Sequence, residues 1–154
     1  MSNTLKIQIP AGFEIDNFDP KTGEVKFKET PKDIKERIKT FVDVLIVLNI
    51  DGSAFAEQTQ NLPSDELAYK QLKLIAQALN QGWTPDWSNK MEYKYYPWFE
   101  IGSPSGGGFS FGGYDLWYSV SLVGSRLCFK SSELAEYAGK QFEAIYKDFL
   151  TLNK

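Results

Sequence analysis

The chain has 154 residues, of which 42% are hydrophobic and 24% charged, with a net charge of −3 and a pI near 5.1. These values are those of one folded domain, so we expect residues 1–154 to form a single domain and exclude a largely disordered chain. The chain contains no histidine, which removes the commonest general base and the commonest metal ligand of proteins. We therefore expect a protein that is not an enzyme and that holds no metal and no cofactor.

Residues 5–29 predict a β-hairpin. Leu5, Ile7 and Ile9 alternate with polar residues, and Val25 and Phe27 alternate with charged ones. Alternation with a period of two is typical of strands with one buried and one solvated face. Turn formers lie between the two runs, namely Asp19, Pro20 and Gly23.

Residues 31–50 carry two overlapping patterns. Ile34, Ile38 and Phe41 have helical spacing, whereas the β-branched residues between 42 and 50 alternate as in a strand. Thr40 and Asp43 have the spacing of a helix-capping box. We favour a helix over roughly 40–49, with a strand as the alternative.

The next segment predicts a loop followed by a long helix. Residues 51–63 are rich in Gly, Ser, Gln and Asn, which indicates a loop. Ser64 then suits a helix cap, with Asp65 and Glu66 in the first turn, where the helix dipole favours negative charge. Gly82 is a natural stop for this helix.

Three further strands and a helix are expected in the rest of the chain. The first strand spans residues 93–101 and is interrupted at Pro97, which points to an edge or a bulge. After a glycine-rich connection over 102–113, strands follow over roughly 114–122 and 125–130. Ser131 or Ser132 then caps a last helix, whose apolar stripe runs from Leu134 to Leu152. Glu136 pairs with Lys140 on its solvated side.

The order of these elements is β-β-α-α-β-β-β-α. It predicts the α+β class, with a mostly antiparallel sheet of about five strands and helices packed on one of its faces.

Aromatic residues gather between residues 83 and 118. All four tryptophans, five of the eight tyrosines and three phenylalanines lie there. Such side chains suit a binding surface, although strands also favour them in a core. The candidate ligand-binding residues are Trp83, Trp87, Tyr95, Tyr96, Trp98, Phe109, Phe111, Tyr114, Arg126 and Lys130.

Charge disfavours nucleic acid as the ligand of this aromatic segment. Residues 83–118 contain two lysines and four acids, a balance of −2, whereas non-specific nucleic-acid binding depends on Lys and Arg at phosphates. The glycines at 106–108 lack the Gly-Lys-Ser/Thr sequence of a phosphate-binding P-loop.

The single cysteine, Cys128, excludes an intrachain disulfide and favours the cytoplasm. Without a histidine beside it, we expect Cys128 to pack as a small hydrophobic residue. The longest apolar run, around residues 42–50, is too short to span a bilayer, and no signal peptide is visible. We therefore expect no membrane association.

Five stretches together carry a further pattern: ALNQGWTPDWSN at 78–89, YYPWF at 95–99, VGSRLCFKS at 123–131, AEYAGKQF at 135–142 and IKTF at 38–41. They resemble a family of short proteins from phages, prophages and mobile elements of gut Bacteroidetes-type bacteria. The resemblance covers roughly residues 35–150 and implies a phage or mobile-element context in a bacterial cell. The family has no established function, so it implies no activity and no site residue.

Three functions remain open. The first is an accessory protein of a phage or mobile element, such as an anti-defence factor, that binds a host protein or a nucleotide-like small molecule through the aromatic, glycine-rich face. The second is a single-stranded nucleic-acid-binding protein that stacks bases on the same aromatics. The third is a virion structural or assembly protein, for which a homo-oligomer is expected.

Overall fold

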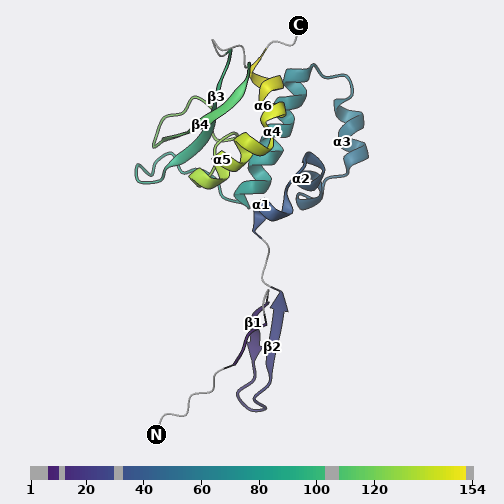
Figure 1. Cartoon of the computed structure of the whole chain (residues 1–154), viewed down its shortest axis with the longest axis vertical. Coiled ribbons are helices and arrows are strands. Elements are labelled where there is room, and N and C mark those ends of the chain that lie inside the picture. Colours follow the sequence, from purple (N-terminus) through teal and green to yellow (C-terminus); the bar gives the residue numbers. More distant parts are fainter. Residues whose placement is uncertain (1–6, 11–12, 30–32, 103–107, 152–154) are drawn as a thin grey trace. The chain divides into compact units, whose positions relative to one another are not determined.

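The computed structural model describes residues 7–10, 13–29, 33–102 and 108–151. Within these ranges the fold is α+β, as predicted (Figure 1). The chain separates into two compact units, residues 1–33 and 34–154, and each is described by itself. The single domain expected over 1–154 stays a prediction.

The first unit is an antiparallel hairpin of β1 (Phe13–Phe18) and β2 (Val25–Glu29). The hairpin was predicted, but its first strand was placed wrongly. Ile7 and Ile9 lie outside any strand, and Leu5 lies outside the described residues. A β-bulge between Ile15 and Asn17 explains the error, because the extra residue breaks the alternation on which the prediction depended.

The second unit begins with three short helices, α1 (Ile34–Arg37), α2 (Phe41–Val47) and α3 (Gly52–Thr59). The capping box of α2 is present: the Asp43 N–H donates to Thr40 Oγ1 at 3.3 Å, and the Thr40 N–H donates to Asp43 Oδ2 at 2.7 Å. The helix favoured over 40–49 is therefore confirmed. The loop predicted over 51–63 is wrong for most of its length, since Asp51 caps α3 by accepting from the Ala54 N–H at 2.7 Å.

The long helix α4 (Ser64–Asn80) is confirmed, but its N-cap is Pro63 and not the predicted Ser64, which is its first residue. The helix ends where Gln81 and Gly82 adopt positive φ angles of 51° and 84°. The last predicted helix is divided into α5 (Ser132–Gln141) and α6 (Glu143–Leu150). Phe142 separates them with φ −116° and ψ 27°. Ser131 caps α5, accepting from the Leu134 N–H at 3.4 Å.

The second unit contains an antiparallel ribbon of β3 (Lys94–Glu100) and β4 (Ser110–Trp117), with a bulge between Trp98 and Phe99. The sheet of about five strands is therefore wrong: the described residues form two separate two-stranded sheets. The strand predicted over 114–122 is displaced toward the N-terminus, since β4 begins at Ser110 and ends at Trp117. The glycine-rich connection predicted over 102–113 is therefore wrong for residues 110–113, and its residues 103–107 lie outside the described ranges. The strand predicted over 125–130 is reduced to one bridge, in which the Tyr95 and Phe129 backbones exchange two hydrogen bonds.

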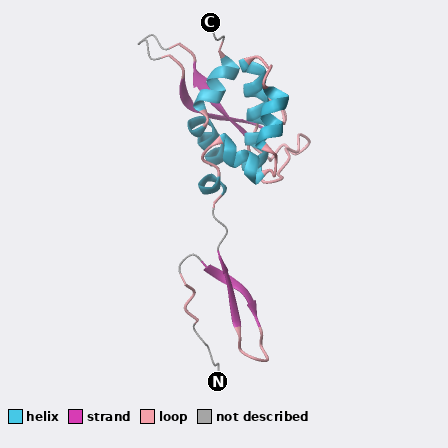
Figure 2. Ribbon diagram, turned by 90° about the vertical axis from the view of Figure 1, so that its right-hand side faces the viewer, coloured by secondary structure: helices cyan, strands magenta, loops and turns pink. Residues whose placement is uncertain are grey.

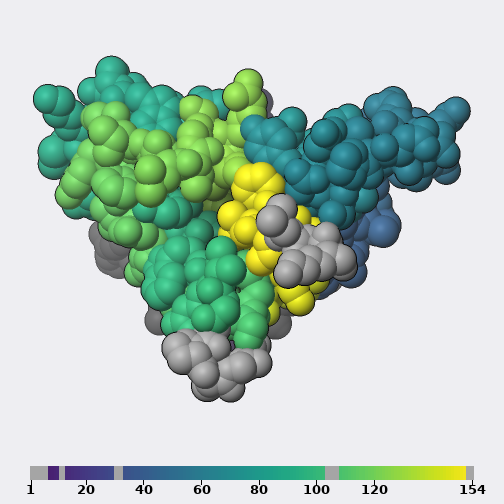
Figure 3. Space-filling view, turned by 90° about the horizontal axis from the view of Figure 1, so that it is seen from above, coloured from purple at the N-terminus to yellow at the C-terminus, as the bar shows by residue number. Residues whose placement is uncertain are grey.

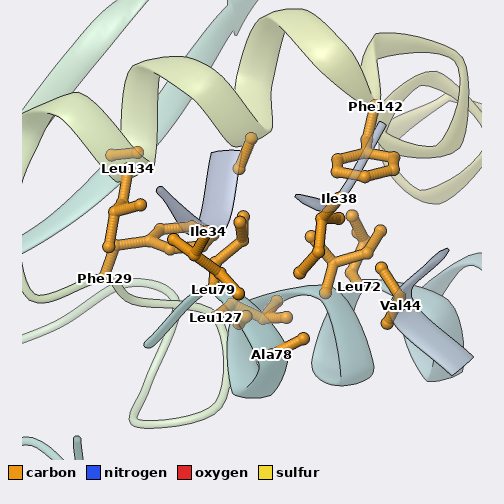
Figure 4. Packing of buried hydrophobic residues seen from close by; sticks show 14 of the residues in the cluster. Ile34, Ile38, Val44, Leu72, Ala78, Leu79, Leu127, Phe129, Leu134 and Phe142 are labelled. Atoms are coloured by element: carbon orange, nitrogen blue, oxygen red, sulfur yellow. The ribbon is translucent and has the colours of Figure 1, made fainter. Parts of the chain in front are cut away.

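The core of the second unit lies among the helices. Figure 4 shows Leu72 and Leu79 of α4 on one side, Leu134 and Phe142 on the other, and Ile38 between them. One face of the β3–β4 ribbon packs against α5, and Figure 2 shows the strands of this unit lying behind its helices. At this contact a Cβ atom on Gly139 would lie 2.5 Å from the Phe111 ring, so helix and ribbon meet closely because Gly139 has no side chain.

Candidate functional site

A buried lysine organises the loop between α4 and β3. The Lys94 side chain is 1% exposed, and its Nζ donates to the backbone carbonyls of Asp86, Asn89 and Glu92 at 2.5, 3.2 and 2.8 Å. It also forms an ion pair with Glu92 Oε1 at 3.1 Å. The loop therefore folds around one ammonium group, which gives defined positions to the tryptophans that it carries.

Carboxylates complete the internal pairing of this loop. The Glu92 side chain accepts from the Asp86 N–H at 2.8 Å, and the Asp86 side chain accepts from the Ser88 N–H at 2.9 Å and hydroxyl at 2.6 Å. These hydrogen bonds lower the pKa of both carboxyl groups, with a further contribution from Lys94. Both acids are thus occupied in holding the loop together.

Hydrogen bonds from this loop and from α4 fix the segment that precedes α5. The Trp87 indole lies 5.4 Å from Lys94 Nζ and donates to Ser125 Oγ at 2.7 Å. From α4, the Asn80 side-chain amide donates to the Cys128 carbonyl at 2.8 Å and accepts from the Lys130 N–H at 3.0 Å. Figure 3 shows the two segments side by side, teal around residues 83–93 and light green around 118–128.

A pocket of about 560 Å³ opens where α4, the loop and this segment meet. Ligand pockets of proteins typically have volumes of about 300–1,000 Å³. It is lined by Lys73, Ala76, Gln77 and Asn80 of α4, by Trp83, Thr84 and Pro85, and by Ser125 and Arg126.

The pocket combines an aromatic ring with positive charge. Its described lining includes two cations, Lys73 and Arg126, and no acid. Lys73 Nζ lies 4.6 Å from the Tyr69 ring, and Arg126 is exposed. Because a guanidinium presents several donors in one plane, Arg126 suits a phosphate or carboxylate, while Trp83 offers a flat surface for stacking.

Two of the ten predicted residues, Trp83 and Arg126, line this pocket. Trp87 lies beside it and fixes the loop. Lys130 is exposed, and its Nζ lies 3.4 Å from Gln81 Oε1. Sequence reasoning missed Lys73 and Gln77, although their helical spacing with Asn80 places all three on one side of α4.

Three predicted aromatics pack against other rings of the second unit: Tyr96, which is buried, and Phe109 and Phe111, which are half-buried. Tyr96 is 7% exposed and stacks on Trp117, whose indole donates to the Tyr96 hydroxyl. Phe109 and Phe111 have ring centroids 4.8 and 6.0 Å from that of Phe99. Core packing accounts for these three side chains without a ligand.

Trp98 lies flat on the neighbouring strand. A Cβ atom on Gly112 would lie 2.2 Å from the indole of Trp98, and one on Gly113 would lie 3.0 Å from it. These glycines therefore allow the indole to cover the backbone of β4 while 43% of Trp98 remains exposed.

The remaining predicted aromatics belong to a patch that we call the tyrosine surface: Tyr93, Tyr95, Tyr114 and Tyr118. Ring centroids are 4.9 Å apart for Tyr93 and Tyr118, 6.1 Å for Tyr93 and Tyr95, and 6.0 Å for Tyr95 and Tyr114. Tyr93, Tyr114 and Tyr118 are each more than 40% exposed. Cross-strand alternation places all four on one face of the ribbon, so the pairing of β3 with β4 was needed to identify Tyr93 and Tyr118.

Cys128 is buried, as expected for a structural thiol. Removal from water raises its pKa to about 11. The thiolate is the reactive form of cysteine, so Cys128 is not placed or ionised to act as a nucleophile near neutral pH.

Comparison with known protein families, with characterised proteins and with solved structures finds no match to this chain. Across the ranges that the structure describes, no group of three or more His, Cys, Asp or Glu side chains could hold a metal ion. No helix in those same ranges combines the length and apolar character needed to cross a membrane.

Proposed function

We propose that this protein acts by binding, and that its pocket accepts a small anion with a flat ring, such as a nucleotide-like molecule. The observation that supports this most directly is the lining of the pocket, where Trp83 lies with Lys73 and Arg126 and the described residues supply no acid. An accessory role for a phage or mobile element, including anti-defence, is part of the proposal and depends on the sequence resemblance.

The pocket suits a mononucleotide better than a nucleic-acid strand. Strand-binding proteins combine several stacking rings with a basic groove that follows the backbone. The described lining provides one indole and two cations within about 560 Å³, which matches one base and one phosphate group. The four tyrosines of the tyrosine surface line no part of this pocket.

Isothermal titration calorimetry with AMP and ATP tests the proposal, with inorganic phosphate as the reference for charge alone. We expect both nucleotides to bind more tightly than phosphate, because only they can also stack on Trp83. Arg126→Gln should raise the Kd for ATP by about tenfold or more, since a charge-assisted hydrogen bond contributes roughly 1.5–3 kcal/mol.

Lys130→Gln is the matched control. It removes one exposed positive charge only four positions from Arg126, at a residue outside the pocket lining, so the Kd should stay within about twofold of wild type. Equal weakening by both substitutions would indicate non-specific attraction of anions. Absence of nucleotide binding, or equal affinity for phosphate, would contradict the proposal.

A protein partner is the second candidate, favoured by the tyrosine surface. Tyrosine is enriched in the centres of protein interfaces, because it is large, rigid and able to form hydrogen bonds. Tyr93, Tyr114 and Tyr118 remain exposed in one contiguous patch, so core packing does not account for them. Tyr118→Ser should weaken capture of a host protein from lysate, whereas Arg126→Gln should not.

A further inference from the structure

One side of the pocket carries a lysine that is held beside an aromatic stack. Lys73 Nζ lies 4.6 Å from the centroid of the Tyr69 ring, which comes one helical turn earlier on α4. The Tyr69 ring stacks on Phe149 of α6, with centroids 5.6 Å apart and an angle of 18° between the planes. Both rings pack against the core. The ammonium group of Lys73 therefore has a fixed aromatic surface beside it, which favours one position of the side chain.

The second cation of the pocket comes from a different element. Arg126 lies on the segment before α5, which the Asn80 amide and the Trp87 indole hold by hydrogen bonds. Arg126 and Lys73 thus line the same pocket from its two sides. Within the described ranges, neither cation forms an ion pair with an Asp or Glu, and no acid lines the pocket. The described residues therefore leave both positive charges without a counter-charge.

The charge of a phosphate group depends on how it is bonded. A terminal phosphate carries a charge of about −1.5 to −2 near pH 7 and has three oxygens that accept hydrogen bonds. A phosphodiester carries only about one negative charge. Arg126 can bind two oxygens of one group as a bidentate pair, and the ammonium of Lys73 suits a further oxygen as a point charge. Two cations without a counter-charge therefore match a terminal phosphate better than a diester.

We propose that the pocket selects nucleotides with a terminal phosphate over phosphodiesters, and that Tyr69 is the positioning residue of Lys73 in this selection. The inference rests on the proposed function, because it specifies the class of nucleotide that the pocket takes. AMP and ATP have a terminal phosphate, whereas cyclic nucleotides and the interior of a nucleic-acid strand have only diesters. Stacking on Trp83 is open to both classes, so the selection acts through Lys73.

Isothermal titration calorimetry with AMP and 3′,5′-cyclic AMP near pH 7 tests the selection, because the two share base and sugar and differ at the phosphate. Wild type should bind AMP at least about tenfold more tightly. Lys73→Met should raise the Kd for AMP by about tenfold or more, since it removes a charge-assisted hydrogen bond, and the Kd for cyclic AMP by no more than about threefold. Arg126→Gln should weaken both, because both ligands have oxygens that the guanidinium binds.

Lys70→Met is the matched control for Lys73→Met. It removes the same kind of charge from the same helix, at an exposed residue outside the pocket lining. The ratio of the two Kd values should stay within about twofold of wild type, because an exposed charge away from the ligand is screened by salt.

The role of Tyr69 is tested by keeping or removing its ring. Tyr69→Phe should leave the Kd for AMP within about twofold of wild type, because a cation–π contact needs the face of the ring and not the hydroxyl. Tyr69→Leu should raise it about three- to tenfold, since Lys73 must then be immobilised when the ligand binds. In a Lys73→Met background, Tyr69→Leu should have no further effect, a result that a general loss of structure would not produce. Thermal unfolding followed by circular dichroism checks that each variant is folded.

Each way of failing has its own result. Equal affinity of wild type for AMP and cyclic AMP, or equal weakening of both by Lys73→Met, would overturn the selection, while binding that depends on Arg126 would leave the proposed function in place. An AMP affinity that Tyr69→Leu does not change would overturn the role of Tyr69. Absence of binding by either nucleotide to wild type would contradict the proposed function and this inference with it.

Discussion

Replacing Lys94 with methionine tests how the loop that carries Trp83 is held. Methionine keeps a long unbranched side chain but removes the ammonium group, so the carbonyls of Asp86, Asn89 and Glu92 lose their shared donor. Because the Lys94 side chain is 1% exposed, the replacement leaves these carbonyls facing an apolar side chain. An unsatisfied buried polar group costs roughly 1–3 kcal/mol.

The expected loss of unfolding free energy is about 3 kcal/mol. Removing one partner of a fully buried ion pair costs about 3–5 kcal/mol, and the lower end applies here because the Glu92 side chain is 27% exposed and regains water. For a unit of this size, each kcal/mol lowers the Tm by about 3–5 °C, so Lys94→Met should lower it by roughly 10–15 °C.

Urea denaturation followed by tryptophan fluorescence and far-UV circular dichroism measures this loss. Lys90→Met is the control, since Lys90 is an exposed lysine of the same loop and its replacement should change stability by less than about 0.5 kcal/mol. Lys94→Met should also weaken ATP binding, because the loop positions Trp83. A stability within about 1 kcal/mol of wild type would refute the argument that Lys94 organises the loop.

Three further predictions concern packing, reactivity and pH. Gly139→Ala should destabilise the protein by about 1 kcal/mol or more in the same urea assay, because overpacking against Phe111 outweighs the gain in helix propensity; stabilisation would show that the contact yields easily. Cys128, with its pKa raised to about 11, should react with a thiol reagent at pH 8 only after unfolding, and rapid labelling of the native protein would contradict its burial. The pKa of Glu92 is lower in the folded protein than its value of about 4.3 in the unfolded chain, so ionised Glu92 stabilises the fold above that pH. This stabilisation is lost as the pH falls through the pKa of Glu92 in the folded protein, so Glu92→Gln should flatten the decrease in urea midpoint below about pH 4.

Capping residues in the sequence correctly predicted where two of the helices begin. Thr40 with Asp43 and Ser131 mark α2 and α5 because each cap binds backbone groups three residues away. The helix α3 was missed although Asp51 provides the same kind of cap. The Gly, Ser, Gln and Thr of this segment are typical of loops, so the prediction followed composition and overlooked Asp51, the residue that caps the helix.

Long-range contacts explain why the strand predicted over 125–130 is wrong. The apolar run Leu127–Phe129 has the composition of a strand, and its burial agrees with that. However, one side-chain amide of Asn80 bonds both the Cys128 carbonyl and the Lys130 N–H, which are groups that a neighbouring strand would otherwise satisfy. Nothing local to either segment indicates that a helix residue some 50 positions earlier takes this role.

The candidate site shows why a cluster in the sequence need not be a cluster in space. Strand alternation separates Tyr95 from Tyr96, so one joins the tyrosine surface and the other stacks on Trp117 in the interior. Trp83 precedes the strand and lies instead with Lys73 of α4, which no aromatic pattern includes. The pocket and the tyrosine surface therefore consist of different residues. It follows that Arg126→Gln and Tyr118→Ser should act independently: a double variant should lose ligand binding by the same factor as Arg126→Gln alone, and partner binding by the same factor as Tyr118→Ser alone.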